Sequence, residues 1–519
     1  MEKRFMSDER TQVMTAAGIV RGYLYDGIYV FKGMPYARAQ RFQKPEDTPP
    51  WEGVRDCTSY GYVSPLLNQE RPVGELLVPH RYWLMDEHCQ NLNVWTPGTD
   101  GAKRPVLVWL HGGGYSAGSA IEQAAYEGEN MSRLGDVVVV SVNHRLNILG
   151  YLDLSPYGER YEDSGNAGGN DIIAALKWVR KNIAAFGGDP GNVTVFGQSG
   201  GGGKVVTLLQ SPEADGLYHR GAVISGVLPD GLMGSVSNDS RPLVRAMLAE
   251  LNLTKEQVSE LETLPYELLA KAYNRVAPRL KAAGEYVGCV PRPGKSYLGN
   301  PMNVDFREET ADVPLMVGTV YGEFAFAPLI YDKRKMTRQD GAALITGRYG
   351  REAAGRLLPL YENAYPHRNP ADLMVLDGMF RRYASEFIAK RAALGRGAVY
   401  SYLFDADFPV EGGKPAWHCA DLAFFFHNTA LVPSANIPGV TDRLEECMFG
   451  ALIAFAKSGD PNHDGLPAWP RCDAREERTM LFNGSPHVRV NFDRELLDAF
   501  QEIAKKEEER ARAEADIRH

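Results

Sequence analysis

The sequence predicts an α/β protein built on one large, mostly parallel sheet that helices cover on both faces. Short runs of β-branched and apolar residues alternate with segments of helical periodicity, which is the order expected for parallel strands joined by helices. The chain has 519 residues, of which 44% are hydrophobic, and no Ser/Gly tract, low-complexity run or internal repeat divides it. We therefore expect a single large unit over residues 1–519.

The elements of this sheet are expected in a definite order along the chain. Residues 15–31 indicate an antiparallel hairpin at one edge. Residues 105–110 form a strand that ends at a glycine-rich loop, and residues 137–142 are continuously apolar, as in a strand buried on both faces. Helical spacing over residues 171–186 ends at Gly187-Gly188-Asp189-Pro190. Further strands are expected at residues 193–197, 222–225, 313–317 and 399–404.

The C-terminal segment, residues 495–519, is highly charged. Its apolar residues share one side at helical spacing; they are Leu496, Leu497, Phe500 and Ile503. This pattern predicts a helix that docks briefly on the body and then frays. An oligomer contact is the alternative, so we expect a monomer or a weak homo-oligomer.

Bulk composition excludes several classes of function. The net charge is −9 with acidic and basic residues interspersed, and without a basic stripe nucleic acid is not an expected partner. No apolar run approaches the ~20 residues that span a bilayer, and residues 1–10 lack the apolar stretch of a signal peptide. Six cysteines without a Cys-x-x-Cys pair predict neither a disulfide framework nor a zinc site. We expect a cytoplasmic protein without a metal or cofactor.

The most informative motif is Gly197-Gln198-Ser199-Gly200-Gly201. It follows the β-branched run Val193–Phe196 and continues into a run of small and apolar residues up to Leu209. This is the strand, sharp turn and helix of a nucleophile elbow, in which flanking glycines leave room for a serine in strained backbone geometry. The motif predicts Ser199 as a nucleophile.

A second glycine-rich segment, His111-Gly112-Gly113-Gly114, follows the strand at 105–110. A loop without bulky side chains can direct backbone N–H groups at a developing oxyanion, although a flexible glycine turn is the simpler interpretation. With Ser199 downstream, the pattern predicts an oxyanion hole made by the N–H groups of Gly113, Gly114 and Gly200.

Several ordered segments together resemble the type-B carboxylesterase/lipase family of α/β-hydrolases, which includes cholinesterases and bacterial para-nitrobenzyl esterases. The segments that carry the resemblance are Phe31–Ala37, Leu92–Pro97, Phe186–Pro190, Thr194–Gly201, Gly459–Asn462 and Trp469-Pro470. The resemblance implies an α/β-hydrolase fold in which helical insertions form a gorge or cap. It also implies a serine esterase that needs no metal or cofactor.

The resemblance also places the acid and the base of a catalytic triad. Glu323 lies in Gly318–Phe324, which is similar to the family's Gly-x-x-x-x-Glu setting, but Gly322 and Phe324 flank it where Asp and Gly are usual. His418 lies in Pro415–Asp421, which resembles Gly-Ala-x-His-x-x-Glu and follows the strand predicted at 399–404. The chain order nucleophile, acid, histidine is that of the fold.

Other polar residues of these segments receive secondary roles. His427 is the rival base, with a helix-surface position as its simpler interpretation. We expect His111 to hold the oxyanion loop rather than to transfer protons, and Ser225, from a Ser-Gly pair similar to one in the family, to support the triad. Cys89 matches a family half-cystine, but no cysteine lies near Ser64, where its partner would be.

Residues of the substrate pocket are predicted from their positions beside the triad. Gln198 stands where cholinesterases carry a glutamate, so we expect neutral, apolar esters to be preferred to choline esters. Tyr115, Phe324 and Trp417 supply aromatic bulk near the gorge, although aromatic residues also dominate protein cores.

The sequence thus predicts a two-step hydrolysis of small-molecule carboxylic esters through an acyl-enzyme on Ser199. An amidase or carbamate hydrolase using the same triad is an alternative. A non-catalytic binding module is a third reading, against which the presence of all three triad candidates argues.

Overall fold

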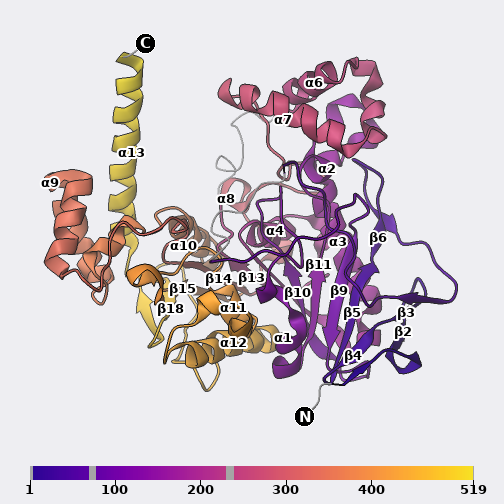
Figure 1. Ribbon diagram of the computed structural model, residues 1–519, viewed down its shortest axis with the longest axis horizontal. Coiled ribbons are helices and arrows are strands. Elements are labelled where there is room, and N and C mark those ends of the chain that lie inside the picture. The colour runs from indigo at the N-terminus through magenta and orange to yellow at the C-terminus, as the bar shows by residue number, and fades with distance from the viewer. Residues whose placement is uncertain (1–3, 69–76, 229–238, 518–519) are drawn as a thin grey trace.

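The computed structural model describes residues 4–68, 77–228 and 239–517. A 12-stranded sheet crosses these residues in the order β1-β4-β5-β9-β11-β10-β12-β13-β14-β15-β18-β19 (Figure 1). The central strands, all parallel, are β11 (Val138–Val142), β10 (Arg104–Leu110), β12 (Gly188–Gln198), β13 (Arg220–Ile224), β14 (Leu315–Val320), β15 (Val399–Phe404) and β18 (Arg478–Phe482). The antiparallel edges are β1 (Phe5–Met6), β4 (Tyr23–Tyr25), β5 (Ile28–Pro35), β9 (Asn91–Thr96) and β19 (His487–Val490). The expected α/β-hydrolase sheet is confirmed.

Both faces of this sheet are covered, as strand β10 illustrates. Val106, Val108 and Leu110 point into one apolar cluster, whereas Leu107 and Trp109 point into another on the opposite face. The first cluster is completed by α3 (Ala167–Asn182), α4 (Gly200–Leu208) and α10 (Phe380–Ala392). The second is completed by α1 (Gly128–Gly135), α11 (Leu422–Phe425) and α12 (Thr441–Ser458). Parallel strands read as continuous apolar runs because both faces are buried in this way.

Helices inserted between the strands build two further apolar clusters. α6 (Arg241–Glu250) and α7 (Tyr266–Ala282) pack together beside α2 (Asn147–Tyr151). α9 (Arg338–Ala364) packs against the beginning of α13 (Arg494–Ile517), on the opposite side of the molecule in Figure 1. Among the α-helices of the described residues, α8 (Pro301–Val304) is short.

The C-terminal helix docks as its apolar pattern predicted. Leu496 and Leu497 are buried, and Phe500 and Ile503 are partly buried against α9. Residues 518–519 of the predicted segment lie outside the described residues.

The predicted hairpin over residues 15–31 is divided between two sheets. β4 and β5 form an antiparallel pair in the main sheet. β3 (Ile19–Arg21) instead joins β2 (Gln12–Met14) and β8 (Val54–Asp56) in a small sheet. Two further sheets have two strands each. One pairs β6 (Ala37–Arg38) with β7 (Glu46–Asp47), and the other pairs β16 (Asp407–Phe408) with β17 (Lys414–Pro415).

The six cysteines, all in described parts of the chain, are free thiols. Across residues 4–68, 77–228 and 239–517, no helix combines the length and the apolar character needed to cross a membrane.

Candidate active site

Ser199 lies on the sharp turn between β12 and α4, with φ 57° and ψ −126°. This conformation is sparsely populated by non-glycine residues and is found where surrounding structure enforces it. A Cβ on Gly197 would lie 2.4 Å from the Gly201 carbonyl carbon, and one on Gly201 would lie 1.9 Å from the Leu110 oxygen. The turn therefore requires both glycines, and it holds Ser199 at the end of the central strand.

A hydrogen bond joins the predicted acid to the predicted base. His418 Nδ1 lies 2.5 Å from Glu323 Oε2, and the Glu323 side chain is fully buried. The other carboxylate oxygen, Oε1, accepts from Ser225 Oγ at 2.6 Å and from Val320 N at 3.0 Å. The two loops are also joined through their backbones, since His418 N donates to Glu323 O at 3.2 Å. Ser225 therefore has the supporting contact that the sequence suggested.

The remaining ring nitrogen, His418 Nε2, faces Gln198. The Gln198 amide nitrogen lies 3.0 Å from it, and Cys419 Sγ donates to Gln198 Oε1 at 3.3 Å. Within the described parts of the chain, Ser199 Oγ makes no hydrogen bond. The side chain of Gln198, the residue before Ser199, thus contacts the nitrogen that would accept the proton of a nucleophilic serine.

Two further carboxyl groups lie behind Glu323. Burial raises the pKa of Asp377 and of Asp421 to about 7, and the nearby Glu323 charge adds to the rise in each. Asp377 accepts from backbone N–H groups at the start of α10. Asp421 accepts from Tyr402 Oη at 2.9 Å, and its Oδ1 has no partner within the described residues. Asp421 stands at the last position of the histidine motif, which was the only signal for it; nothing in the sequence pointed to Asp377.

On the other side of Ser199 lies the predicted oxyanion loop. Gly113 and Gly114 have φ of 86° and 59°, and neither N–H group is donated to an acceptor in the described chain. Gly200 is the first residue of α4, where a backbone N–H has no partner within the helix. A Cβ on Gly200 would lie 2.5 Å from Gly114 N, so these N–H groups are close neighbours beside Ser199.

A buried lysine supports this loop. Lys204 Nζ, on α4, donates to His111 O at 2.7 Å. Burial lowers the pKa of Lys204 to about 7, which the charge of the partly buried Glu122 opposes, and desolvation raises the pKa of Glu122 to about 7. Sequence reasoning missed both residues, although a lysine inside a small, apolar helical run was a usable signal.

His111 contacts its own loop, as expected. Its Nδ1 lies 3.0 Å from Gly112 O, and its ring stacks on His144 with centroids 5.1 Å apart. Burial, followed by the Lys204 charge, holds the pKa of His111 well below its usual range, so the ring is neutral and Nδ1–H donates to the Gly112 carbonyl.

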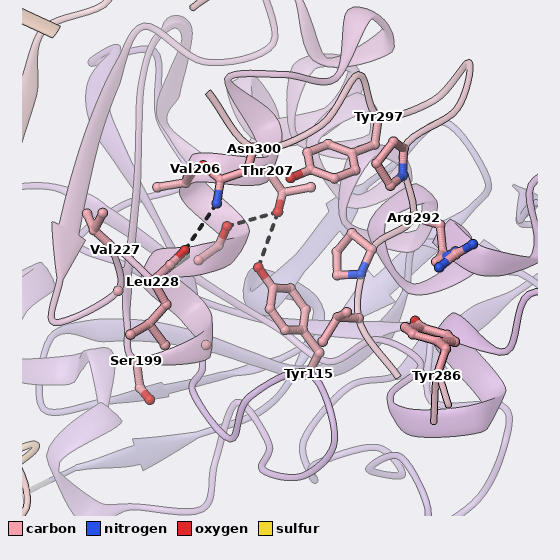
Figure 2. A pocket seen from close by; sticks show the side chains of 16 residues that line it. Tyr115, Ser199, Val206, Thr207, Val227, Leu228, Tyr286, Arg292, Tyr297 and Asn300 are labelled. Carbon is pink, nitrogen blue, oxygen red and sulfur yellow. Dashed lines mark hydrogen bonds between the residues drawn. The ribbon is translucent and has the colours of Figure 1, made fainter. Parts of the chain in front are cut away.

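An open cavity of about 870 Å³, mouth included, begins at Ser199 and Gly200 (Figure 2). Six aliphatic residues form much of its wall: Val206, Val227, Leu228, Val290, Pro291 and Pro293. Tyr115 lines it with its hydroxyl directed at Thr207 Oγ1, 3.2 Å away (Figure 2). The cavity accepts a largely apolar group next to the nucleophile.

The other predicted pocket residues lie elsewhere. Trp417 lines a second cavity of about 410 Å³ together with Cys419. Phe324 is 60% exposed, with its ring centroid 6.4 Å from that of His418. Gln198 is buried against His418 and lines neither cavity. His427, the rival base, faces Glu445 and packs on Phe449.

No group of three or more His, Cys, Asp or Glu side chains in the described segments could hold a metal ion. The arrangement of serine, histidine, buried carboxylate and free N–H groups is sufficient for acyl transfer.

Comparisons with known proteins agree with this chemistry. The model of the Carboxylesterase family matches residues 9–500. The chain is 30% identical over 482 residues to a para-nitrobenzyl esterase of Bacillus subtilis (strain 168), covering 91% of this chain and 94% of that protein. It is 32% identical over 495 residues to a phenmedipham hydrolase of Pseudarthrobacter oxydans, with coverage of 90% and 94%.

Solved structures extend the likeness to three dimensions. An esterase from anaerobic Clostridium hathewayi that can hydrolyse aliphatic aromatic polyesters is 53% identical, with a TM-score of 0.94 over 97% of this chain and 100% of that one. A carboxylesterase of Geobacillus stearothermophilus is 32% identical, with a TM-score of 0.73 over 94% of this chain and 99% of that one.

Proposed function

We propose that Ser199 forms the acyl-enzyme of this chain, which belongs to the carboxylesterase family and is a carboxylic ester hydrolase. The observation that carries the proposal is the placement of Ser199. Its backbone is strained, and the N–H groups of Gly113, Gly114 and Gly200 beside it have no acceptor among the described residues. The preceding residue, Gln198, contacts His418, which is hydrogen-bonded to Glu323.

The reaction follows from this geometry. His418 Nε2 takes the Ser199 proton as Oγ attacks the ester carbonyl, and Glu323 stabilises the imidazolium that results. The three N–H groups bind the oxyanion, and the loss of one such donor typically costs ~100-fold or more in rate. The protonated base then transfers its proton to the leaving alcohol, and water releases the acid in a second round.

The cavity beside Ser199 supports a preference for neutral esters with an apolar acyl group. Six aliphatic side chains line it, and the described residues of its lining include no carboxylate. Apart from Ser199, its polar lining groups come from Tyr115, Thr207, Tyr286, Tyr297, Asn300 and Arg292. We propose para-nitrophenyl and alkyl esters of uncharged acids as the substrates with the highest kcat/KM.

The test is Ser199→Ala together with covalent labelling. We expect the variant to fold with an unchanged unfolding temperature and to lose ester hydrolysis, because only one hydroxyl group is removed. An organophosphate should modify Ser199 in the wild type and leave the variant unlabelled in a mass spectrum. Full activity in Ser199→Ala would contradict the proposal.

Carbamate hydrolysis is a second candidate for the same site, because one relative is a phenmedipham hydrolase. A carbamate and an ester with the same leaving group separate the two activities when their kcat/KM values are compared.

Polyester hydrolysis is favoured by the similarity to the Clostridium hathewayi esterase and by Phe324, an apolar ring exposed beside His418. Release of soluble acid from an aliphatic aromatic polyester film tests it.

A further inference from the structure

We propose that Gln198 is a positioning residue that occupies the acceptor nitrogen of His418 in the resting enzyme and thereby restrains attack by Ser199. The proposal rests on the proposed function, since it assigns a role to a neighbour of that nucleophile. The proposal predicts that removal of the Gln198 amide accelerates acylation.

The contacts define which atoms of Gln198 face the base. Glu323 accepts from His418 Nδ1, so the proton of the neutral ring resides there and Nε2 presents a single lone pair. The Gln198 amide nitrogen, a donor only, lies 3.0 Å from that lone pair. The Cys419 thiol donates to Gln198 Oε1 at 3.3 Å, and burial raises the pKa of this thiol well above its usual value, which keeps it a donor. Both ends of the amide are therefore correctly paired.

The backbone of Gln198 is held in place, so a backbone movement does not easily separate its amide from His418. Gln198 is the last residue of β12, paired with Ile224 of β13, and its side chain is buried. A Cβ on Gly112 would lie 3.0 Å from Gln198 O, so the oxyanion loop packs directly against this peptide. Release of Nε2 must therefore occur by rotation of the Gln198 side chain or of the His418 ring.

This contact stabilises the resting state and not the transition state. As Ser199 Oγ bonds to the ester carbon, its proton moves to Nε2, and a protonated Nε2 cannot accept from the Gln198 N–H group. An interaction present only before the reaction raises the barrier, because catalysis depends on interactions that strengthen in the transition state. The amide could instead help by fixing the ring tautomer, but the charged bond to Glu323 already does so.

The experiment compares Gln198→Met with the wild type. Methionine has a similar volume and donates no hydrogen bond. A net hydrogen bond contributes about 0.5–1.5 kcal/mol, so the first-order acylation burst with a para-nitrophenyl ester should become about 2- to 10-fold faster. The rate at which an organophosphate labels Ser199 should rise by the same factor.

Controls separate this role from simple packing. Gln210 is another buried glutamine, whose amide donates to Asp305 O, and Gln210→Met should leave the burst rate unchanged. Gln198→Glu replaces the donor with an anion that pairs with the imidazolium. We expect it to move the acid limb of the kcat/KM profile to higher pH, whereas a packing defect would lower kcat/KM at every pH.

The outcomes distinguish this proposal from the identity of the nucleophile. Labelling of Ser199 at an equal or slower rate in Gln198→Met would overturn the restraint while leaving the nucleophile in place. Absence of any Ser199 labelling in the wild type would overturn the proposed function first. If Gln198→Met does not fold, Gln198→Ala also removes the amide and provides the same comparison. A burst no faster than that of the wild type in this variant would overturn the proposal.

Discussion

The two flanks of Ser199 hold opposite kinds of ionisable group. On the His418 side, three buried carboxyl groups converge, those of Glu323, Asp377 and Asp421. On the oxyanion side, the group that contacts the loop is the buried Lys204 side chain, which donates to the His111 carbonyl. The nearby Glu122 charge opposes the effect of burial on the pKa of the lysine.

This difference follows the charge that develops during acylation. A positive charge forms on the imidazole and a negative charge on the carbonyl oxygen, and fixed charges in a water-poor site stabilise such changes without reorganising. The carboxylate side faces the developing cation, and the lysine side faces the developing anion. The comparison therefore predicts that neutralising either flank slows the chemical step, and that the effect is larger where the contact is direct.

The largest effect is expected from the carboxylate flank through Glu323→Gln. An amide retains the shape but neither stabilises the imidazolium nor fixes the correct tautomer, and the equivalent loss in a serine protease costs ~10⁴-fold in kcat. We expect a fall of ~10³- to 10⁴-fold, measured with a para-nitrophenyl ester. Glu323→Gln combined with His418→Ala should be no worse than the more damaging single variant, because the three residues act as a unit. A loss of less than 10-fold would show that another carboxyl group, such as Asp421, serves as the acid.

The oxyanion flank is tested by Lys204→Met, for which we expect a smaller effect. Lys204 contacts the loop and not the substrate, so kcat should fall by about 10-fold, less than the ~100-fold for a missing oxyanion donor, with KM little changed. The unfolding temperature should not fall, because burial of the lysine is unfavourable, as its lowered pKa of about 7 indicates. Lys177→Met is the matched control at a half-exposed lysine; equal losses of kcat in both variants would contradict a role for Lys204.

The sequence predicted one part of this comparison and not the other. The strand at 399–404, the turn at Ser199 and the loop at 111–114 were correctly located because local patterns and glycine requirements determine them. The bond between Glu323 and His418 followed from the order of the family motifs. Local patterns cannot show which distant side chains meet in the interior.

Three residues illustrate that limit. Lys204 and Glu122 are 82 residues apart in the sequence, and tertiary packing brings them close enough for the Glu122 charge to act on Lys204, so this pairing was not visible in the sequence. Gln198 was expected beside the substrate, but the choice of rotamer directs its amide at His418. Trp417 was expected in the gorge, but it lines a separate cavity. Its position next to His418 in the sequence does not determine on which side the indole ring packs.

The smallest effect on activity, and the most specific effect of pH, is expected from Asp421→Asn. Asp421 contacts Tyr402 rather than His418 or the cavity, so kcat should change by less than about 3-fold. Burial raises the pKa of Asp421 to about 7, so the folded protein binds this proton more tightly than the unfolded chain does. The stability that the protonated group contributes is complete below about pH 4 and is lost as pH rises through about 7.

An asparagine cannot ionise, so the variant should lose less unfolding free energy than the wild type between pH 4 and pH 8. The advantage at pH 8 should be about 1–4 kcal/mol, given 1.36 kcal/mol for each unit of pKa change. Asp377 has a shift of the same sign and remains in the variant, so the slope should become shallower without disappearing. Urea unfolding at several pH values measures it. An unchanged slope would mean that Asp421 is ionised in the folded enzyme and that the carboxylate flank carries more charge than its burial allows.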